Sequence, residues 1–344
     1  MEENYQYLHK RYLRLMRWSY CVPESAISDQ LGPDLGATRY SNLADLEKLM
    51  SDAALRRQGR ARFYNGYWRL LLREAIEAVP RQTRLRETAI YIGEVPDPRF
   101  NAKIMTVFKS GEFQGYLLLV NRGLEMFLYR VACILVGAMK LKFEGSTPEP
   151  SSKTTDFAPE FDVSDAKARI QRNIELLARY QHEMPAALGP QHAMVAATYA
   201  YAMQQYVVGH ELGHVLCDMN RQHLTNVTTD REEEFFADEM AGIFCHELID
   251  CLTQQGTPSK LAERAMFEAP FIIFPILGAV DDLMPKHTNR PRLTHPPPSE
   301  RTEQHLARLQ RSNIDDFYVE LARQRIEQMR EFTTAEAPPV RGAR

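Results

Sequence analysis

The chain has 344 residues, of which 44% are hydrophobic and 25% are charged, and its formal net charge is −3. These values are ordinary for a globular protein with a core, and they exclude wholesale disorder and a disulfide-stapled miniprotein. A net charge this close to zero gives no reason to expect nucleic acid as the main partner. The most apolar stretches are 131–139 and 271–280, and Pro275 is expected to break the second. Both are shorter than the about 20 residues that span a bilayer. We therefore expect no transmembrane segment.

The N-terminal part of the chain is predicted to be helical. Residues 1–20 place apolar side chains at helical spacing with basic side chains between them, which predicts a basic amphipathic helix docked on the domain. Its positive charge leaves contact with an acidic membrane surface open as an alternative. Further helices are predicted over 42–57 and 61–78. We expect residues 1–82 to form an N-terminal helical region.

Three segments with strand character follow. Residues 88–93, 100–108 and 115–120 are rich in β-branched and aromatic side chains. Turn residues that begin at Lys109 connect the last two segments, which predicts a β-hairpin. We expect a small antiparallel sheet here, followed by an apolar helix that begins at Gly123.

The rest of the chain is predicted to be mostly helical, apart from an insert and a tail. Residues 145–163 are rich in Pro, Ser, Thr and acidic side chains, which predicts a flexible insert that could gate a site. Residues 333–344 contain Ala, Pro, Gly and Arg and are predicted to be a disordered tail. Helices are predicted over 165–182, 191–219 and 230–255. The fold class is therefore expected to be α+β, mostly helical, with its main domain over 83–332.

A metal-binding motif lies in the longest predicted helix, in the sequence His210-Glu211-Leu212-Gly213-His214. Side chains four positions apart share one face of a helix, so the two imidazoles can bind one zinc ion. A glutamate directly after the first histidine can act on water at that zinc as a general base. The alternative is a chance pair of surface histidines. Gly213 argues against it, because glycine costs about 1 kcal/mol in a helix interior and is expected where another backbone comes close.

Two carboxylates in the following helix extend the pattern. Glu234 and Asp238 are also four positions apart and share a helix face. Glu234 is expected to be the third protein ligand of zinc, and Asp238 the carboxylate that orients a ligating histidine. The alternative is a solvated acidic helix start, which describes Glu232 and Glu233 well. It describes Glu234 less well, because the apolar residues after it predict a buried helix.

The order HExxH then ExxxD, at 210–214 and 234–238, resembles the gluzincin metallopeptidases. Segment 294–297 with Arg301 is similar to a THPP…R segment downstream of the active site in HtpX-like and CAAX-prenyl-protease-like peptidases. Region 100–124 resembles the strand hairpin upstream of their metal helix. Members of that family often have transmembrane helices, so a soluble relative is expected. Peptidases of the Lit type and of the ImmA/IrrE type are further possible neighbours.

The resemblance implies a zincin-like fold and a zinc-dependent endopeptidase that hydrolyses peptide bonds of a protein substrate. Glu211 would be the general base, and His295 the donor that helps to hold the oxyanion, with Arg301 and Tyr206 as alternatives. A substrate is expected to add as an extended strand to the hairpin 101–120. The expected substrate-binding residues are Asn101, Ala102, Tyr116, Leu118 and Arg301.

The sequence also bears on the cellular compartment and on alternative functions. The five cysteines lack CxxC spacing, which favours reduced thiols in a cytoplasmic protein. Unrestrained proteolysis there is harmful, so we expect narrow specificity or a regulatory partner. The alternative function is a non-catalytic peptidase-fold module that binds or senses, and the intact Glu211 counts against it. A third class, a membrane-surface protein, depends only on the basic helix at 1–20.

Overall fold

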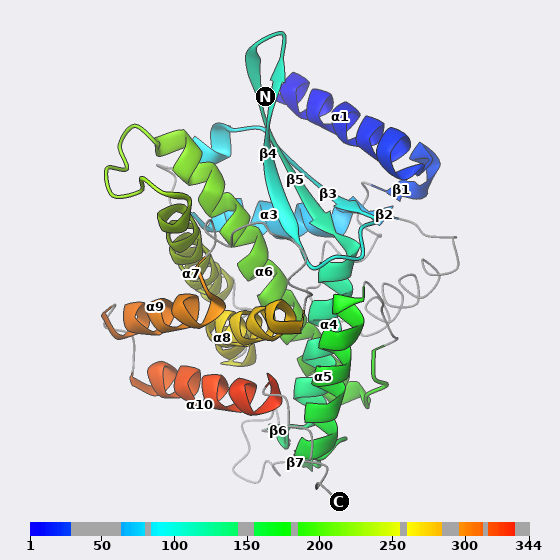
Figure 1. The fold of residues 1–344 in the computed structure, drawn as a ribbon, viewed down its shortest axis with the longest axis vertical. Helices are drawn as coiled ribbons and strands as arrows, with labels where there is room; N and C mark the ends of the chain where they lie inside the picture. Colours follow the sequence, from blue (N-terminus) through cyan, green and yellow to red (C-terminus); the bar gives the residue numbers. More distant parts are fainter. Residues whose placement is uncertain are drawn as a thin grey trace, which may run out of the picture.

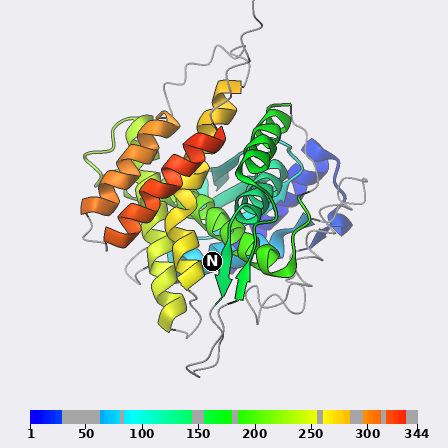
Figure 2. The ribbon, with the colours of Figure 1, turned by 90° about the horizontal axis from the view of Figure 1, so that it is seen from below.

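The computed structural model confirms an α+β chain in which helix prevails over a small sheet (Figures 1 and 2). No helix in the described part of the chain is apolar over a length sufficient to cross a membrane. The predicted helix at 42–57 and most of the predicted tail lie outside the described residues. The structure describes residues 1–28, 63–79, 84–143, 155–179, 185–254, 260–283, 296–311 and 316–333.

The helices and strands are numbered in chain order. The described helices are α1 (Glu2–Tyr20), α3 (Asn65–Ala78), α4 (Arg122–Gly137), α5 (Val163–Ala178), α6 (Pro190–Asn220), α7 (Asp230–Gln254), α8 (Lys260–Leu283), α9 (Pro298–Arg311) and α10 (Asp316–Thr333), with the 3₁₀ turns η1 (Glu24–Ala26) and η3 (Arg84–Glu87). The described strands are β1 (Ile27–Ser28), β2 (Phe63–Tyr64), β3 (Ile90–Val95), β4 (Ala102–Lys109), β5 (Glu112–Asn121), β6 (Leu141–Phe143) and β7 (Thr155–Phe157).

The main sheet is mixed, so the expectation of an antiparallel sheet was wrong in part. Its strand order is β3-β5-β4. The predicted hairpin is confirmed, because β4 pairs antiparallel with β5. However, β5 lies between β3 and β4 in the sheet, although it follows both in the sequence. It pairs parallel with β3. Among the described strands, only β5 pairs with β4, on one of its two edges.

The sheet separates two hydrophobic cores of different size (Figure 1). On one face, Leu8, Tyr12 and Met16 of α1 pack against β-strand residues that include Leu117 and Leu119. The other face belongs to the large core that contains α3 to α8. The N-terminal helix is therefore docked as predicted, with its apolar side buried and its lysine and arginines exposed.

Two local expectations need correction. Pro275 does not interrupt its segment, because α8 runs from Lys260 to Leu283 and contains both Pro270 and Pro275. Each proline removes one backbone N–H, and burial of neighbouring side chains such as Phe271 and Phe274 favours the helix nevertheless. The insert predicted over 145–163 is shorter at its C-terminal side, because Thr155–Phe157 forms β7 against β6 and α5 begins at Val163. Residues 144–154 lie outside the described part.

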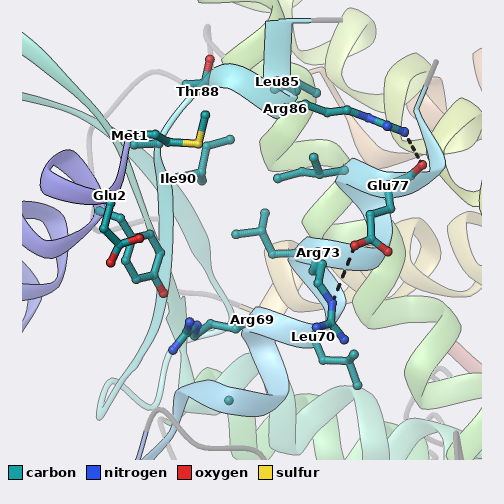
Figure 3. Close-up of a pocket in the computed structure, with 15 residues that line it drawn as sticks. Met1, Glu2, Arg69, Leu70, Arg73, Glu77, Leu85, Arg86, Thr88 and Ile90 are labelled. Atoms are coloured by element: carbon teal, nitrogen blue, oxygen red, sulfur yellow. Dashed lines mark hydrogen bonds and ion pairs between the residues drawn. The ribbon is translucent and has the colours of Figure 1, made fainter. Parts of the chain in front are cut away.

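A groove of about 670 Å³ lies where α1, α3, η3 and β3 meet (Figure 3). Arg86 reaches back from η3 to the last turn of α3, where it donates to the carbonyl oxygens of Glu77 and Val79. Arg73 and Glu77 face each other at 4.0 Å at the rim, with side chains 56% and 68% exposed. Arg86 thus caps the end of α3, and the Arg73–Glu77 pair is exposed to solvent. These roles account for the charged groups of the groove without a ligand.

Candidate metal centre

The candidate centre lies where α6 and α7 cross at very short range. Gly209 and Gly213 on α6 face Ala241 and Ala237 on α7. A Cβ atom added at Gly213 would lie 2.6 Å from the Cα of Ala237, and one added at Gly209 would lie 3.0 Å from the Cα of Ala241. Real Cβ contacts are longer, so only glycine permits this crossing. The expectation that Gly213 marks the approach of another backbone is confirmed.

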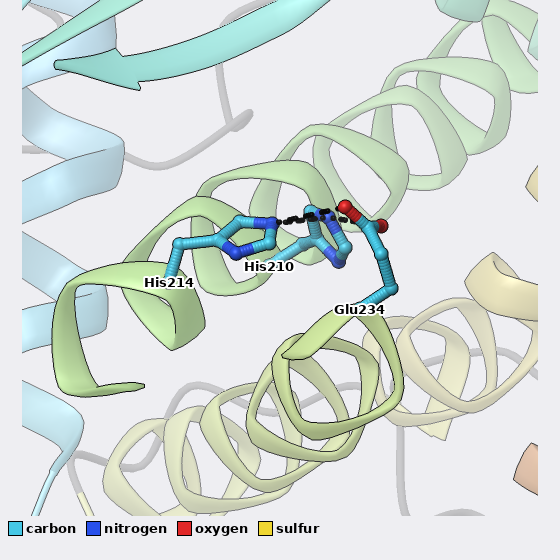
Figure 4. A group of neighbouring side chains, drawn as sticks. All are labelled: His210, His214 and Glu234. Carbon is cyan, nitrogen blue, oxygen red and sulfur yellow. Dashed lines mark hydrogen bonds and ion pairs between the residues drawn. The ribbon is translucent and has the colours of Figure 1, made fainter. Parts of the chain in front are cut away.

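The crossing brings together the three ligands predicted from the sequence (Figure 4). His210 and His214 project from α6 toward the carboxylate of Glu234 on α7. The Nε2 atoms of the two histidines are 3.2 Å apart. Nε2 of His210 lies 3.5 Å from Oε2 of Glu234, and Nε2 of His214 lies 3.6 Å from Oε1. One ligand atom from each residue falls within 4.8 Å of the others, so the group could hold a metal ion.

These separations agree with the size of a small divalent ion. Four ligands at about 2.0–2.1 Å from a tetrahedral centre are roughly 3.3 Å from one another. The Nε2–Nε2 separation of 3.2 Å lies close to that edge length, and the two Nε2 atoms lie 3.5 and 3.6 Å from different oxygens of Glu234. The three side chains are therefore close enough together to hold an ion.

Each histidine is held by a second carboxylate at its other ring nitrogen. Nδ1 of His210 lies 3.0 Å from Oδ1 of Asp238, as the sequence predicted. Nδ1 of His214 lies 3.1 Å from Oε1 of Glu233, which the sequence analysis assigned to a solvated helix start. Glu232 does lie at a solvated helix start. Its pKa falls because its carboxylate accepts hydrogen bonds from Thr228 and Thr229, just before α7. Nothing in the pattern distinguished Glu233 from Glu232, because only the path of α6 places His214 beside it.

The two carboxylates settle which nitrogen carries the proton. A carboxylate accepts hydrogen bonds, so Nδ1 of each ring is the donor and each neutral ring keeps a lone pair on Nε2. Those lone pairs face each other and the oxygens of Glu234. Burial is the largest influence on His210 and lowers its pKa, but the hydrogen bond to Asp238 and the charges of Asp238 and Glu234 together raise that pKa above its ordinary value. Burial and the charge of His210 lower the pKa of His214. A bound cation would neutralise this concentration of acceptors.

Asp238 is itself fixed by Arg301, in a contact between α7 and α9. Nε of Arg301 donates to Oδ2 of Asp238 at 2.7 Å, and Nη2 donates to Oδ1 at 2.5 Å. The hydroxyl of Tyr206 lies 3.5 Å from the same Oδ1 atom. Burial raises the pKa of Asp238, but the charge and hydrogen bonds of Arg301 hold it well below its ordinary value. Asp238 therefore stays ionised and can orient His210.

Glu211 lies beside the three ligands without belonging to them. Its side chain is buried, and the backbone N–H of Ile104 in β4 donates to its carboxylate. Burial raises the pKa of Glu211 to about 7, while the charge of His210 opposes that rise. A carboxylate with a pKa near 7 can both accept and return a proton at neutral pH.

The ligands open into a cleft of about 660 Å³ that runs along β4. Asn101, Ala102, Tyr116 and Arg301, which the sequence analysis expects to bind substrate, line this cleft. The hydroxyl of Tyr116 donates to Asp218 at 2.7 Å, at the end of the cleft near His214. Leu118 does not line the cleft, because it lies on the central strand with its side chain in the large core.

His295 lies outside the described residues. Other histidines and cysteines near the motifs in the sequence are not part of the centre. His223 and His246 are exposed, and the thiols of Cys217 and Cys245 are buried. Within the described part of the chain, His210, His214 and Glu234 are the group found with metal-ligand geometry.

No known protein family, curated protein or solved structure matches the chain. The resemblance to gluzincins therefore depends on the motifs in the sequence and stays a prediction.

Proposed function

We propose that the protein is a zinc-dependent peptidase that cleaves an extended segment of a protein substrate. The observation that carries this proposal is the placement of Glu211 between a His210–His214–Glu234 group and the open edge of β4. Metal ligands, a carboxylate of raised pKa and a strand edge share one cleft, which is the combination that metal-assisted hydrolysis of a peptide requires.

The donor set favours zinc over other common ions. Two imidazole nitrogens and one carboxylate form a ligand set of catalytic zinc sites, in which a fourth position stays open. Magnesium and calcium prefer sites made entirely of oxygen ligands. The hydrogen bonds from both Nδ1 atoms to Asp238 and Glu233 also match the outer carboxylates that orient zinc-bound histidines.

Each residue has a distinct role in the proposed reaction. Zinc bound here would supply Lewis acidity, which activates water and polarises a carbonyl group. Glu211 takes the proton from the attacking water and passes it to the leaving nitrogen. Arg301, which is 4.0 Å from Glu234 and lines the cleft, keeps Asp238 ionised and can donate toward the carbonyl oxygen of a substrate. His295 remains the proposed second donor, by resemblance only.

The substrate would pair with β4. Alternate residues of a strand direct their backbone groups to the same side, so Ala102 and Thr106 share the outward direction of the Ile104 N–H. A substrate strand can bond to these groups, and apolar residues at one end of the cleft would accept an apolar side chain. Those residues are Leu124, Val207, Ile273, Phe274 and Leu277.

Two variants test the ligand and base assignments separately. Glu234→Ala removes a ligand and should purify without zinc. Glu211→Gln should keep about one zinc per chain and lose activity, because glutamine cannot accept the proton. Zinc analysis of the purified proteins decides the first point, and equal zinc content in Glu234→Ala and the wild type would contradict the ligand set.

Activity is best sought without assuming a substrate. The protein is incubated with a cell lysate, and new N-termini are mapped by mass spectrometry, with Glu211→Gln as the matched control. Termini that need Glu211 would support a peptidase. Their complete absence, with zinc bound, would favour the non-catalytic binding module instead.

The strand edge can be tested at Thr106, which is exposed. Thr106→Pro removes one outward N–H and should reduce cleavage while the fold persists, whereas Thr106→Ala keeps the N–H and should cleave normally. Normal cleavage by Thr106→Pro would place the substrate elsewhere in the cleft.

A further inference from the structure

A second cavity, of about 390 Å³, lies on the other side of Tyr206 from the metal cleft, between α7, α8 and α9. Its volume falls within the range of small-molecule pockets, about 300–1,000 Å³. Most of its wall is apolar. The apolar wall residues are Ile243, Ile249, Met266, Phe267, Pro270 and Leu309.

Five polar side chains also line the cavity, namely Tyr206, His246, Glu247, His305 and Arg308. Of these, His246 is exposed and Glu247 and Arg308 are partly exposed, whereas His305 of α9 is buried. Only 7% of its surface is exposed. Its ring packs edge-on against the rings of Tyr206, Phe271 and Phe274, with centroid distances of 5.9, 5.5 and 6.4 Å. Among the residues that the structure describes, none is hydrogen-bonded to either ring nitrogen of His305. Both ring nitrogens are therefore available to a molecule that enters the cavity.

Gly242 of α7 gives the imidazole its place in the cavity wall. A Cβ atom at Gly242 would lie 2.9 Å from Cε1 of His305 and 3.4 Å from Nε2. The Cε1–Nε2 edge of the ring therefore faces the glycine, and both residues line the cavity. A larger residue at 242 would push into the ring and reduce the space beside its nitrogen.

Burial keeps the ring of His305 neutral. Burial lowers the pKa of His305 to about 4, opposed by Asp238 and supported by Arg308 and Arg301. Asp238 is bound to Arg301, and Arg308 donates to the backbone carbonyl of Glu239. A neutral imidazole offers one donor and one acceptor. The ligand group that complements His305 itself is therefore uncharged and can both donate and accept.

We propose that this cavity binds a small, uncharged, ring-shaped apolar molecule that carries a hydroxyl group, with the hydroxyl bonded to His305. A hydroxyl suits either ring tautomer, because it both donates and accepts. The apolar wall supplies the favourable burial of the ring. Tyr206 lines both this cavity and the metal cleft, so the ligand would touch a side chain that contacts Asp238. The site does not depend on the proposed peptidase activity.

Phenol and toluene are suitable probes, because they have the same shape and differ by a hydroxyl in place of a methyl group. Each is titrated into the full chain with its methionine methyl groups labelled for NMR, since Met266 lines the cavity. A ligand of this size is expected to bind with Kd on the order of 1 mM. Phenol leaves water less readily than toluene, so phenol binding at least as tightly as toluene would already indicate a polar partner.

Two variants locate the effect. Ile243→Trp fills the cavity from its partly buried rim and should abolish binding of both probes. His305→Phe keeps the ring and should lower the preference for phenol over toluene by about 3- to 10-fold, the worth of one hydrogen bond. Thermal unfolding checks that the variants fold, and the phenol–toluene comparison on the wild type stands without them. Absence of phenol binding at tenfold that concentration, tighter binding of toluene than of phenol to the wild type, or an unchanged preference in His305→Phe would overturn the proposal.

Discussion

Two buried carboxylates in this protein have similar neighbours and differ in one decisive respect. Asp238 lies with Arg301 from α9 and Tyr206 from α6. Glu268 lies with Arg325 from α10 and Tyr199 from α6, with 2.8 Å from its Oε2 atom to Nε of Arg325 and to the tyrosine hydroxyl. Both carboxylates are at least nine-tenths buried. Each cluster therefore joins a C-terminal helix to α6 through an arginine–carboxylate pair.

The cluster at Glu268 is closed. Its other oxygen, Oε1, accepts a hydrogen bond from Arg264 at 2.8 Å, so both oxygens face donors. Both oxygens of Asp238 also face donors, but this cluster is open in another sense, because its donor His210 extends it to the side chain of Glu234. A buried charge pair is thus no sign of a ligand site by itself. Two imidazole nitrogens and a carboxylate that converge on one point form a group that could hold a cation.

The largest expected difference between the clusters is in metal binding. Glu234→Gln should lose the metal, whereas Glu268→Gln should keep about one equivalent in its folded fraction, because Glu268 belongs to the closed cluster. Metal content after gel filtration of both variants measures this. Loss of metal from Glu268→Gln with its fold intact would contradict the separation of the two clusters.

The same pair should respond oppositely in a chelator, where no metal is bound. Glu234→Gln replaces a carboxylate oxygen by an amide donor that can meet the Nε2 lone pairs, so the variant should unfold at a higher temperature than the metal-free wild type. Added zinc should reverse the order, because only the wild type gains stability from binding. An unchanged order in thermal unfolding, with and without zinc, would remove the argument that the acceptors repel one another.

Removal of Arg301 or Arg325 should lower the free energy of unfolding, and removal of Arg301 should also weaken metal binding. Breaking a buried ion pair typically costs about 3–5 kcal/mol of unfolding free energy. Arg325→Met should fall at the low end, because Arg264 still contacts Glu268. Arg301→Met should also weaken metal binding by about 10- to 100-fold, since Asp238 then orients His210 less well. Urea unfolding and chelator competition measure the two effects.

Acid should reveal the neutral state of His305. Its pKa of about 4 lies below the ordinary value of 6.5, so stability is fully present above pH 6.5 and declines as the pH falls toward 4. The loss is roughly 3 kcal/mol, because the unfolded chain is protonated first. His305→Phe lacks this loss. Urea unfolding of the wild type and of His305→Phe in a chelator, at several pH values, measures their free energies of unfolding. The difference between the two free energies should change by that amount between pH 6.5 and pH 4, and a difference that does not vary with pH would contradict the prediction.

Local patterns predicted the parts of the site that local geometry fixes. The spacing within 210–214 and 234–238 placed each pair of side chains on one helix face, and Gly213 indicated a close helix crossing. Long-range contacts were not predictable in this way. The contact of Glu233 with His214 depends on how two helices cross, and the burial of His305 depends on the packing of α9.

The sheet shows the same limit. The hairpin of β4 and β5 was predictable because its turn is local. The parallel pairing of β3 with β5 joins strands that have β4 between them in the sequence, and no periodicity encodes that choice.

The smallest expected effect concerns the crossing that the metal centre needs and the closed cluster does not. Gly213→Ala would place a methyl group 2.6 Å from the Cα of Ala237, which is backbone and cannot turn aside. The helices must separate, at a cost of about 1–3 kcal/mol, and Glu234 would move away from both histidines. Gly278→Ala is the matched control, because its methyl group would meet only the Cβ of Pro298 at 3.7 Å. Alanine there should be neutral or stabilise the helix by up to about 1 kcal/mol. Metal affinity should fall in the first variant and stay unchanged in the second. Equal affinities would mean that the centre tolerates a wider crossing, and Gly213 would then serve packing alone.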